Sequence, residues 1–395
     1  MSKWIKVKIS DLGQVVGGAT PSTKKEEYYN GDIAWITPKD LSDFNGRYIS
    51  KGERSITKAG MESCSTQLLP ENTILFSSRA PIGYLAIAAN EMCTNQGFKS
   101  VIPNDNVDYL FLYYLLKYNK DKIEAMGSGT TFKEVSGSTM RNIEVMIPES
   151  IETQRKIARI LDSIDSKIEN NQKINNNLEQ QAMAYYRELF VLGAKDTWRI
   201  GTIADLGAVV GGSTPSKAKA EYYTDSGIAW ITPKDLSNDK SKYIYHGEND
   251  ITELGLKNSS ASIMPEGTVL FSSRAPIGYI AIAGCSVTTN QGFKSVIPKP
   301  EIGTAFIYYF LKDNLPIIEG MASGSTFKEV SGSTMKNVPA IIPDCTTLAK
   351  FNEFCTPIFE EQRVLESENR SLIETRDRLL SKLMSGELDV TDVEI

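Results

Sequence analysis

Pairs of cations that recur in turn-rich stretches are the side chains of this sequence best suited to chemistry. They occupy corresponding positions in two similar halves of the chain: Lys39 and Lys234, Arg79 and Arg274, Lys99 and Lys294, and Lys133 and Lys328. Lysine and arginine at such positions suit contacts with phosphate groups, and arginine also suits the edge of a guanine base. A structural or solvated role explains each of them equally well, so they are candidates for binding.

Two amide pairs and one variable stretch add to these candidates. Asn95-Gln96 and Asn290-Gln291 could each bind adenine through two hydrogen bonds, although a turn beside a strand uses the same residue types. Residues 43–51 differ from residues 238–246, yet both stretches keep a cation followed by tyrosine, namely Arg47-Tyr48 and Lys242-Tyr243. A surface loop that tunes contacts accounts for this pattern, and so does simple drift.

The residue types of a catalytic or metal site are scarce in this sequence. Its only histidine, His246, aligns with Lys51 in the other half, which excludes a duplicated Ser-His-Asp site. The five cysteines form no CxxC pair, so we expect no zinc site and reduced, mostly buried thiols. Gly17-Gly18 and Gly211-Gly212 lack the spacing of a phosphate-binding motif and are interpreted as turn glycines. We therefore expect a binding protein without catalysis of its own.

Length and composition predict a soluble chain of two domains. With 395 residues, 41% of them hydrophobic and 23% charged, the chain is too long for one ordinary domain and has neither a disordered nor a membrane composition. Its apolar runs are far shorter than the roughly 20 residues that span a bilayer, so we expect a cytoplasmic protein without membrane contact. The net charge is −6, and residues 344–395 hold 12 acidic against 6 basic residues. The globular parts are therefore close to neutral.

An internal duplication is the strongest signal in the sequence. Residues 35–40 return as 230–235, residues 76–84 as 271–279, residues 94–103 as 289–298 and residues 131–140 as 326–335, at an offset of 195. The block that begins at Asp11 returns at Asp205, at an offset of 194. Two large copies indicate a duplicated domain and exclude a solenoid of short repeats.

Each copy reads as a mixed, mostly β domain, which places the chain in the α+β class. Short apolar runs bounded by Gly, Pro and Asn predict strands at 72–76, 85–89 and 99–103. Residues 107–122 and 304–312 space their apolar residues at helical intervals and predict a helix in each copy.

A long helix with heptad-like spacing follows each copy. Steps of three and four residues place one side chain after another on a single seam. The predicted seam consists of Ile157, Leu161, Ile164, Ile168, Asn175, Leu178, Tyr185 and Leu189 in the first helix, and of Phe351, Ile358, Leu365, Asn369, Leu372, Leu379 and Leu383 in the second.

These helices are expected to pair with each other. Packing of each helix on its own domain alone is the simpler alternative, but more than 30 residues at 1.5 Å each exceed the flank of one small domain. Asn175 and Asn369 occupy equivalent seam positions, and we hypothesise that they fix the register of the pair.

The blocks together resemble the DNA-specificity subunits of Type I restriction-modification systems. Residues 127–136, Met140 to Ile143, Ile147-Pro148 and residues 152–157 look like the end of a target-recognition domain entering the family's conserved helix. The second copy carries residues 323–331, 335–338 and 342–343, but Thr346 to Phe351 departs from the charged start of the first helix. The resemblance covers the whole chain as domain, helix, domain, helix.

This resemblance implies an arrangement and a set of partners. Target-recognition domains at 1–149 and 196–343 would lie at opposite ends of an antiparallel pair of helices, at 150–195 and 344–386, with pseudo-two-fold symmetry and an acidic tail at 387–395. Each domain would read one half of a bipartite double-stranded DNA site. Two methyltransferase subunits would dock on the helices and bring S-adenosylmethionine for adenine N6 methylation, and restriction subunits would add translocation with ATP and Mg²⁺.

The closeness of the two copies predicts closely related half-sites. Because a two-fold relation inverts one of them, the DNA target is expected to be near-palindromic around a nonspecific gap. Two other classes of function stay open: a methyltransferase fused to its specificity domains, and an adaptor with two peptide-binding domains on a rigid spacer.

Overall fold

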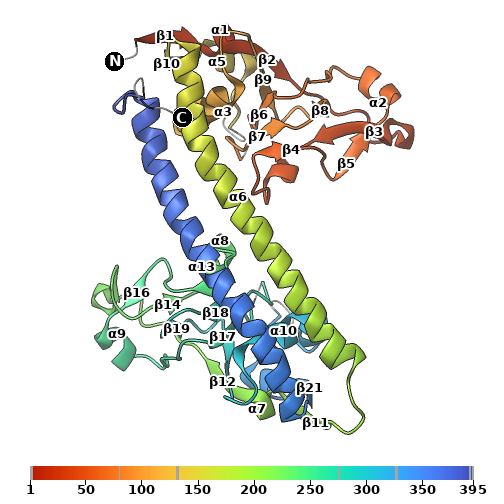
Figure 1. Ribbon diagram of the computed structural model, residues 1–395, viewed down its shortest axis with the longest axis vertical. Helices are drawn as coiled ribbons and strands as arrows, with labels where there is room; N and C mark the ends of the chain where they lie inside the picture. The colour runs from red at the N-terminus through yellow and green to blue at the C-terminus, as the bar shows by residue number, and fades with distance from the viewer. Residues whose placement is uncertain are drawn as a thin grey trace. The chain divides into compact units, whose positions relative to one another are not determined.

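The structure, a computed structural model, describes residues 3–79, 81–129, 133–274, 276–324, 328–390 and 393. The chain folds into two units (Figure 1). Unit 1 comprises Met1–Asn170 and Arg370–Ile395, and unit 2 comprises Asn171–Asn369. Both long helices therefore contribute to both units. The boundaries of the target-recognition domains given above stay a prediction.

Unit 1 contains a succession of short strands and helices before the first long helix. They are β1 (Trp4–Lys8), α1 (Ile9–Leu12), β2 (Gly13–Gly17), η1 (Glu26–Tyr28), β3 (Tyr29–Ile36), η2 (Pro38–Leu41), β4 (Tyr48–Ile49), β5 (Arg54–Ile56), α2 (Lys58–Glu62), β6 (Ile74–Phe76), β7 (Leu85–Ala88), β8 (Met92–Thr94), β9 (Lys99–Pro103), α3 (Tyr109–Tyr118), α4 (Lys120–Ala125), α5 (Gly137–Asn142) and β10 (Glu144–Pro148). The first long helix, α6, spans Ile151–Arg187.

Unit 2 repeats this succession after the short π-helix η3 (Glu188–Leu192). Its elements are β11 (Arg199–Thr202), α7 (Ile203–Leu206), β12 (Gly207–Gly211), η4 (Ala220–Tyr222), β13 (Tyr223–Thr224), β14 (Trp230–Ile231), α8 (Pro233–Asn238), β15 (Tyr243–Ile244), β16 (Asp250–Ile251), α9 (Glu253–Lys257), β17 (Val269–Phe271), β18 (Ile280–Ala283), β19 (Thr288–Thr289), β20 (Lys294–Pro298), α10 (Thr304–Asp313), α11 (Leu315–Gly320), α12 (Gly332–Lys336) and β21 (Pro339–Ile342). The second long helix, α13, spans Cys345–Met384.

A five-stranded central sheet of the same topology lies in each unit. The strand order is β2-β9-β6-β7-β4 in unit 1 and β12-β20-β17-β18-β15 in unit 2. The registers also correspond, because Gly17 pairs with Lys99 as Gly211 pairs with Lys294. Each domain also has an antiparallel ribbon, β1 with β10 or β11 with β21, and smaller sheets, β5-β3-β8 in unit 1 and β13-β16 and β14-β19 in unit 2. The duplication seen in the sequence is therefore a duplication of the fold.

The strands predicted from short apolar runs are confirmed as β6, β7 and β9. The helix predicted over 107–122 is only partly right, because the chain breaks it at Asn119 into α3 and α4. The side-chain amide of Asn119 donates to the carbonyl oxygen of Leu115 at 2.8 Å and so ends the first helix.

The central sheet is buried on both faces. Ile74 and Phe76 of β6 belong to an apolar cluster with α3 and the long helices, whereas Leu75 between them belongs to a second cluster on the opposite face. Val269, Phe271 and Leu270 of β17 divide in the same way. This alternation follows from the two-residue period of a strand, and it gives the sheet a fixed position against the helices.

The two long helices pack against each other in antiparallel direction within each unit, which confirms the predicted pairing. In unit 1, Arg376 donates to Asp165 at 2.9 Å, and Leu161 shares an apolar cluster with Leu383. In unit 2, the ring centroids of Tyr185 and Phe351 lie 6.1 Å apart. The long helices also pack on the domains, against α3 in unit 1 and α10 in unit 2. Packing on a domain therefore occurs in addition to helix pairing, not in place of it.

The two seam asparagines, Asn175 and Asn369, do not bond to each other. Asn369 accepts a hydrogen bond at 2.9 Å from Asn171, not from Asn175, and both partners are buried. The carbonyl oxygen of Asn175 instead accepts from Gln362 at 3.1 Å. In an antiparallel pair, equivalent positions of the two helices lie on different sides of the crossing, so Asn175 and Asn369 do not pair.

Two further expectations concern cysteines and membranes. All five cysteines are free thiols, but only Cys93 and Cys355 are buried, so the expectation that most are buried is wrong. Within the described residues, no helix is both long and apolar enough to cross a bilayer.

Candidate nucleic-acid interface

Most of the sequence-predicted contact residues lie on loops at one end of the central sheet. β2 ends at Gly17 beside Lys99, the first residue of β9, and β6 ends at Phe76 beside Leu85, the first residue of β7. The loops that join these strands therefore leave the sheet at the same end. We call residues 17–20, 77–79, 81–83, 95–99, 128–129 and 133–137 the loop cluster of unit 1. Its counterpart in unit 2 consists of residues 211–214, 272–274, 276–278, 290–294, 323–324 and 328–332.

Backbone hydrogen bonds hold the loop cluster together. The backbone amide of Ser78 donates to the carbonyl oxygen of Gly97 at 2.7 Å. The backbone amide of Val135 donates to the carbonyl oxygen of Ser78 at 2.9 Å. Gly18 lies so close to the strand end that a Cβ atom would approach the carbonyl oxygen of Thr94 to 2.1 Å. The sequence interpretation of Gly17-Gly18 as turn glycines is therefore not confirmed: Gly17 is the last residue of β2, and Gly18 packs against a neighbouring strand end. The loops are therefore fixed to the sheet by main-chain contacts.

A carboxylate between two cations is the main charged feature of the loop cluster. Glu134 Oε2 lies 3.0 Å from Arg79 Nε, and Glu134 Oε1 lies 3.4 Å from Lys99 Nζ. The Arg79 side chain is 47% exposed, whereas that of Lys99 is only 16% exposed. The arginine is therefore the member of the group that faces the solvent most openly.

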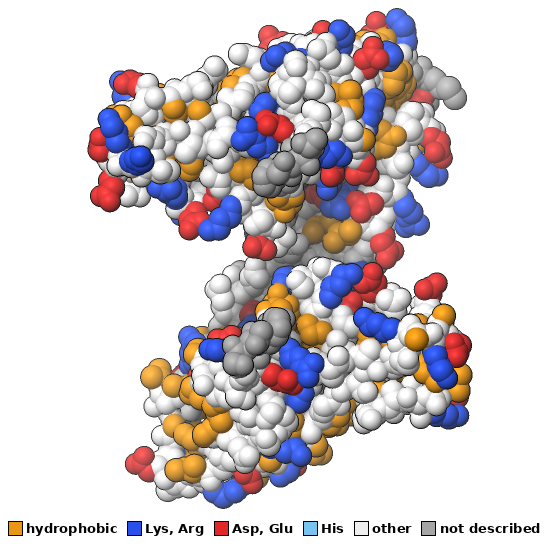
Figure 2. Space-filling view, turned by 180° about the vertical axis from the view of Figure 1, so that it is seen from behind, with side chains coloured by type: hydrophobic (Ala, Val, Ile, Leu, Met, Phe, Trp, Pro, Cys, Tyr) orange, Lys and Arg blue, Asp and Glu red, His pale blue; other side chains and the backbone are white. Residues whose placement is uncertain are grey.

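The same group recurs in unit 2 with nearly the same geometry. Glu329 lies 3.1 Å from Arg274 Nε and 3.5 Å from Lys294 Nζ. Although partial burial raises the pKa of Glu329, the two cations outweigh it, so the pKa is lowered. The carboxylate is consequently ionised at neutral pH. On the face drawn in Figure 2, Lys and Arg side chains are interspersed with Asp and Glu on both units, so the cations of this face act in a mixed field.

The other predicted residues of the loop cluster differ in how far their side chains are engaged. The side-chain oxygen Oδ1 of Asn95 accepts from the backbone amide of Gly97 at 2.8 Å, and Oδ1 of Asn290 accepts from that of Gly292 in the same way. These asparagines are therefore turn residues. Gln96 and Gln291 are exposed, and each accepts a hydrogen bond from a threonine, Thr20 or Thr214. Lys133 and Lys328 are exposed. Of the two amides, the glutamine is the one that faces outward.

Lys39 and Lys234 lie beside the loop cluster. Pro38 contacts Gly97, and the corresponding Pro233 contacts Gly292. Lys39 forms an exposed ion pair with Glu53 at 2.7 Å, and Lys234 forms one with Glu248 at 2.5 Å. Exposed ion pairs of this kind are weak, so these lysines can change partner.

Arg47 and Lys242 lie elsewhere, buried against the long helices. The Arg47 side chain is 6% exposed, and its guanidinium bonds to Glu169 at 2.9 Å, to Ser166 at 2.9 Å and to Asp162. Lys242, 5% exposed, pairs with Glu179 at 2.6 Å. Because these cations are enclosed by carboxylates, their burial does not fit contact with DNA, and we correct the expectation for both.

The tyrosines that follow these cations differ in exposure. Tyr243 is buried, and Tyr48 is partly exposed with its hydroxyl 3.3 Å from that of Tyr109. Burial raises the pKa of Tyr48 and of Tyr243, so both remain neutral phenols. The burial of Tyr243 does not fit contact with DNA, so the expectation for this residue is corrected as well, whereas the role of Tyr48 stays a prediction.

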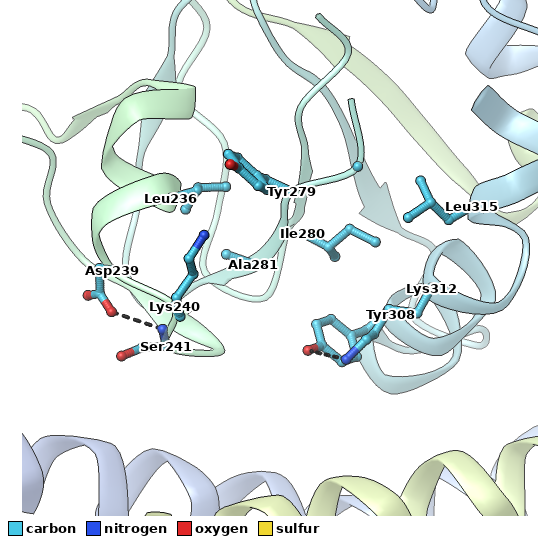
Figure 3. A pocket seen from close by; sticks show the side chains of 11 residues that line it. Leu236, Asp239, Lys240, Ser241, Tyr279, Ile280, Ala281, Tyr308, Lys312 and Leu315 are labelled. Carbon is cyan, nitrogen blue, oxygen red and sulfur yellow. Dashed lines mark hydrogen bonds between the residues drawn. The ribbon is translucent and has the colours of Figure 1, made fainter. Parts of the chain in front are cut away.

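A pocket of about 260 Å³ adjoins the loop cluster of unit 2 (Figure 3). Leu236, Lys240 and Tyr279 line one side, and Tyr308 and Lys312 line the other. The ammonium group of Lys240 lies 4.6 Å from the ring centroid of Tyr279. The corresponding residue of unit 1 is Asn45. This end of the sheet is therefore similar, but not identical, in the two units.

Sequence reasoning missed Glu134, Glu329 and Lys240. The two glutamates were visible as an acid retained in both copies beside Lys133 and Lys328, within the fourth repeated block. Lys240 had no such signal because the repeat does not retain it. In the described part of the chain, no three His, Cys, Asp or Glu side chains gather in a group that could hold a metal ion.

Comparisons with known proteins agree with the duplicated fold. The model of the Type I restriction modification DNA specificity domain matches residues 1–180 and 195–348. The MjaIX specificity subunit of the Type I restriction enzyme from Methanocaldococcus jannaschii is 33% identical, over 99% of this chain and 94% of that protein. The HindI specificity subunit from Haemophilus influenzae is 24% identical, over 74% of this chain and 80% of that protein.

A solved structure supports the fold independently. The S subunit of a Type I restriction-modification system from M. genitalium matches with a TM-score of 0.61 and 19% identity, covering 97% of this chain and 96% of that one. Two segments of this chain match the same family model, and a relative matched over nearly the whole of both chains is one-third identical. The chain belongs to the family of Type I restriction-modification DNA specificity subunits.

Proposed function

We propose that the loop cluster of each unit contacts one half of a bipartite DNA site. The observation that carries this proposal is the arginine, lysine and glutamate group, which recurs with distances that agree within 0.1 Å in the two units. A surface used twice for one task is expected to keep the same chemistry twice. Lys240 in place of Asn45 fits half-sites that are closely related without being identical.

The chemistry of the group suits reading of a guanine. The ion pair with Glu134 engages Arg79 through Nε, whereas a guanine edge can be bound through the two terminal nitrogens. The exposed amide of Gln96 suits adenine, and Lys39 and Lys133 suit phosphates, which position the protein without reading sequence. The inverted relation of the half-sites is an expectation that follows from the family resemblance.

Catalysis is assigned to partner subunits. Two methyltransferase subunits would dock on α6 and α13, bring S-adenosylmethionine and methylate adenine at N6, for which the base has to leave the stack. Restriction subunits would add translocation and cleavage with ATP and Mg²⁺. The chain would act in the cytoplasm, where it would determine the DNA sequence that the complex recognises.

Binding selection followed by substitution tests the location of the contact surface. A pool of randomised DNA duplexes selected with the full-length chain yields the preferred site. In the double variant R79A with R274A, each substitution is expected to weaken binding to that site about 10- to 100-fold, because a bidentate contact contributes about 1–3 kcal/mol. The matched control is R54A, an arginine on β5 that stacks on Tyr29 outside the loop cluster. Equal affinity of the double variant and the wild type would refute the proposed location.

A further inference from the structure

We infer that Glu134 and Glu329 set the discrimination between the cognate site and other DNA. This inference rests on the proposed function of the loop clusters. Each carboxylate lies between an exposed arginine and a mostly buried lysine, and it neutralises part of their charge. Neither glutamate would read a base in this role; each would weaken the attraction of its unit for arbitrary phosphates.

The backbone keeps both carboxylates in place. Glu134 and Ser128 exchange two hydrogen bonds, of 2.8 and 2.9 Å, and Glu134 also forms a β-bridge with Arg79. Glu329 forms the same contacts with Ser323 and Arg274. On such a fixed backbone, the carboxylate stays within reach of its two cations when DNA approaches. The carboxylate, one-third exposed, therefore meets any phosphate that approaches the arginine.

Electrostatics then separates the two kinds of DNA. Nonspecific binding depends on cations that replace counterions at phosphates, so a cation neutralised by a neighbouring carboxylate contributes little to it. At the cognate site the terminal nitrogens of Arg79 contact a base, while the carboxylate still holds Nε and keeps the guanidinium oriented. The glutamate thus lowers the affinity for nonspecific DNA but hardly lowers the affinity for the cognate site, which raises specificity.

The double variant E134Q with E329Q tests this inference. Glutamine keeps the shape and an acceptor oxygen but removes the charge. For nonspecific duplex DNA, the slope of log affinity against log salt is expected to steepen by about 0.9 for each freed cation, about 1.8 in total. Affinity for a 40-base-pair duplex of arbitrary sequence is expected to rise at least tenfold at about 0.1 M salt, whereas affinity for the selected site changes less. The ratio of the two affinities falls accordingly.

A matched control removes the same charges elsewhere. Glu62 on α2 and Glu253 on α9 are exposed acids of the two units that pair with Lys58 and Lys257. The variant E62Q with E253Q is expected to retain the specificity ratio and the salt slope of the wild type within about twofold. A fall of the ratio in this control equal to that in E134Q with E329Q would overturn the inference, because net charge alone would then explain it.

The outcomes distinguish this inference from the proposed function. If R79A with R274A loses specific affinity while E134Q with E329Q leaves the ratio and slope unchanged, the role of the glutamates is refuted and the proposed function stands. If neither double variant changes DNA binding, the proposed location itself fails. Thermal unfolding checks that the glutamine variants fold. Should they not fold, E134D with E329D retains the charge and is expected to keep the wild-type ratio, and a tenfold loss would overturn the inference.

Discussion

Replacing Arg47 by methionine removes a buried cation that anchors a loop of unit 1 to helix α6. Methionine replaces the apolar stem of the arginine but leaves Glu169 and Asp162, whose side chains are 21% and 33% exposed, without their partner. Removing one partner of a buried ion pair costs about 3–5 kcal/mol. Because these carboxylates are partly exposed and can regain water, we expect the lower end, about 3 kcal/mol.

The expected loss is large enough to measure by calorimetry. For a unit of about 200 residues, 1 kcal/mol corresponds to roughly 2–4 °C, so the transition of unit 1 is expected to fall by about 6–12 °C. The matched control is K39M, which removes a cation of the same unit from an exposed ion pair and is expected to cost about 0.5 kcal/mol or less. Similar transitions for R47M and K39M would refute the assignment of Arg47 as an anchor and restore it as a candidate for DNA contact.

Two further predictions concern unit 2. Burial raises the pKa of Glu179, but Lys242 and Lys312 outweigh it and lower the pKa to about 2, below its ordinary value of 4.5. The interaction of Glu179 with these lysines therefore stabilises the fold above pH 4.5, and this contribution is lost as the pH falls towards 2. Urea unfolding of E179Q is expected to show a lower free energy of unfolding at pH 7 and a smaller loss of it between pH 4.5 and 2. A pH profile equal to that of the wild type would contradict this. Replacing Asn171 and Asn369 by leucine removes a buried hydrogen bond of 2.9 Å between α6 and α13. We expect an altered helix register or subunit stoichiometry, measured by crosslinking between the helices and by light scattering, and wild-type behaviour in both would disprove the register role.

Much of the fold could be predicted from sequence because its signals are local or repeated. The duplication predicted two equal domains, and the apolar runs predicted β6, β7 and β9 because strand periodicity is set by nearest neighbours. The heptad spacing predicted that the long helices pair. The pairing of Asn369 with Asn171 could not be predicted from equivalent repeat positions, because the antiparallel direction determines which residues meet.

The candidate site was only partly predictable, because charge partners far apart in sequence decide the role of a cation. Arg47 and Arg79 look alike in sequence, since both are retained as cations in the second copy. Arg47 meets acids 115 and 122 positions away on α6 and is buried. Arg79 meets Glu134 in a loop at the end of the sheet and stays half-exposed. Only the folded chain separates an anchor from a contact residue.

Methylation sequencing tests the central claim most directly. Genomic DNA from cells that express the chain together with the proposed methyltransferase subunits would be sequenced by a method that detects modified adenines. The duplicated loop clusters predict one bipartite motif whose two half-sites are reverse complements at most positions, separated by a fixed gap of arbitrary sequence. Two half-sites with no relation to each other, or modification without a defined motif, would contradict the account.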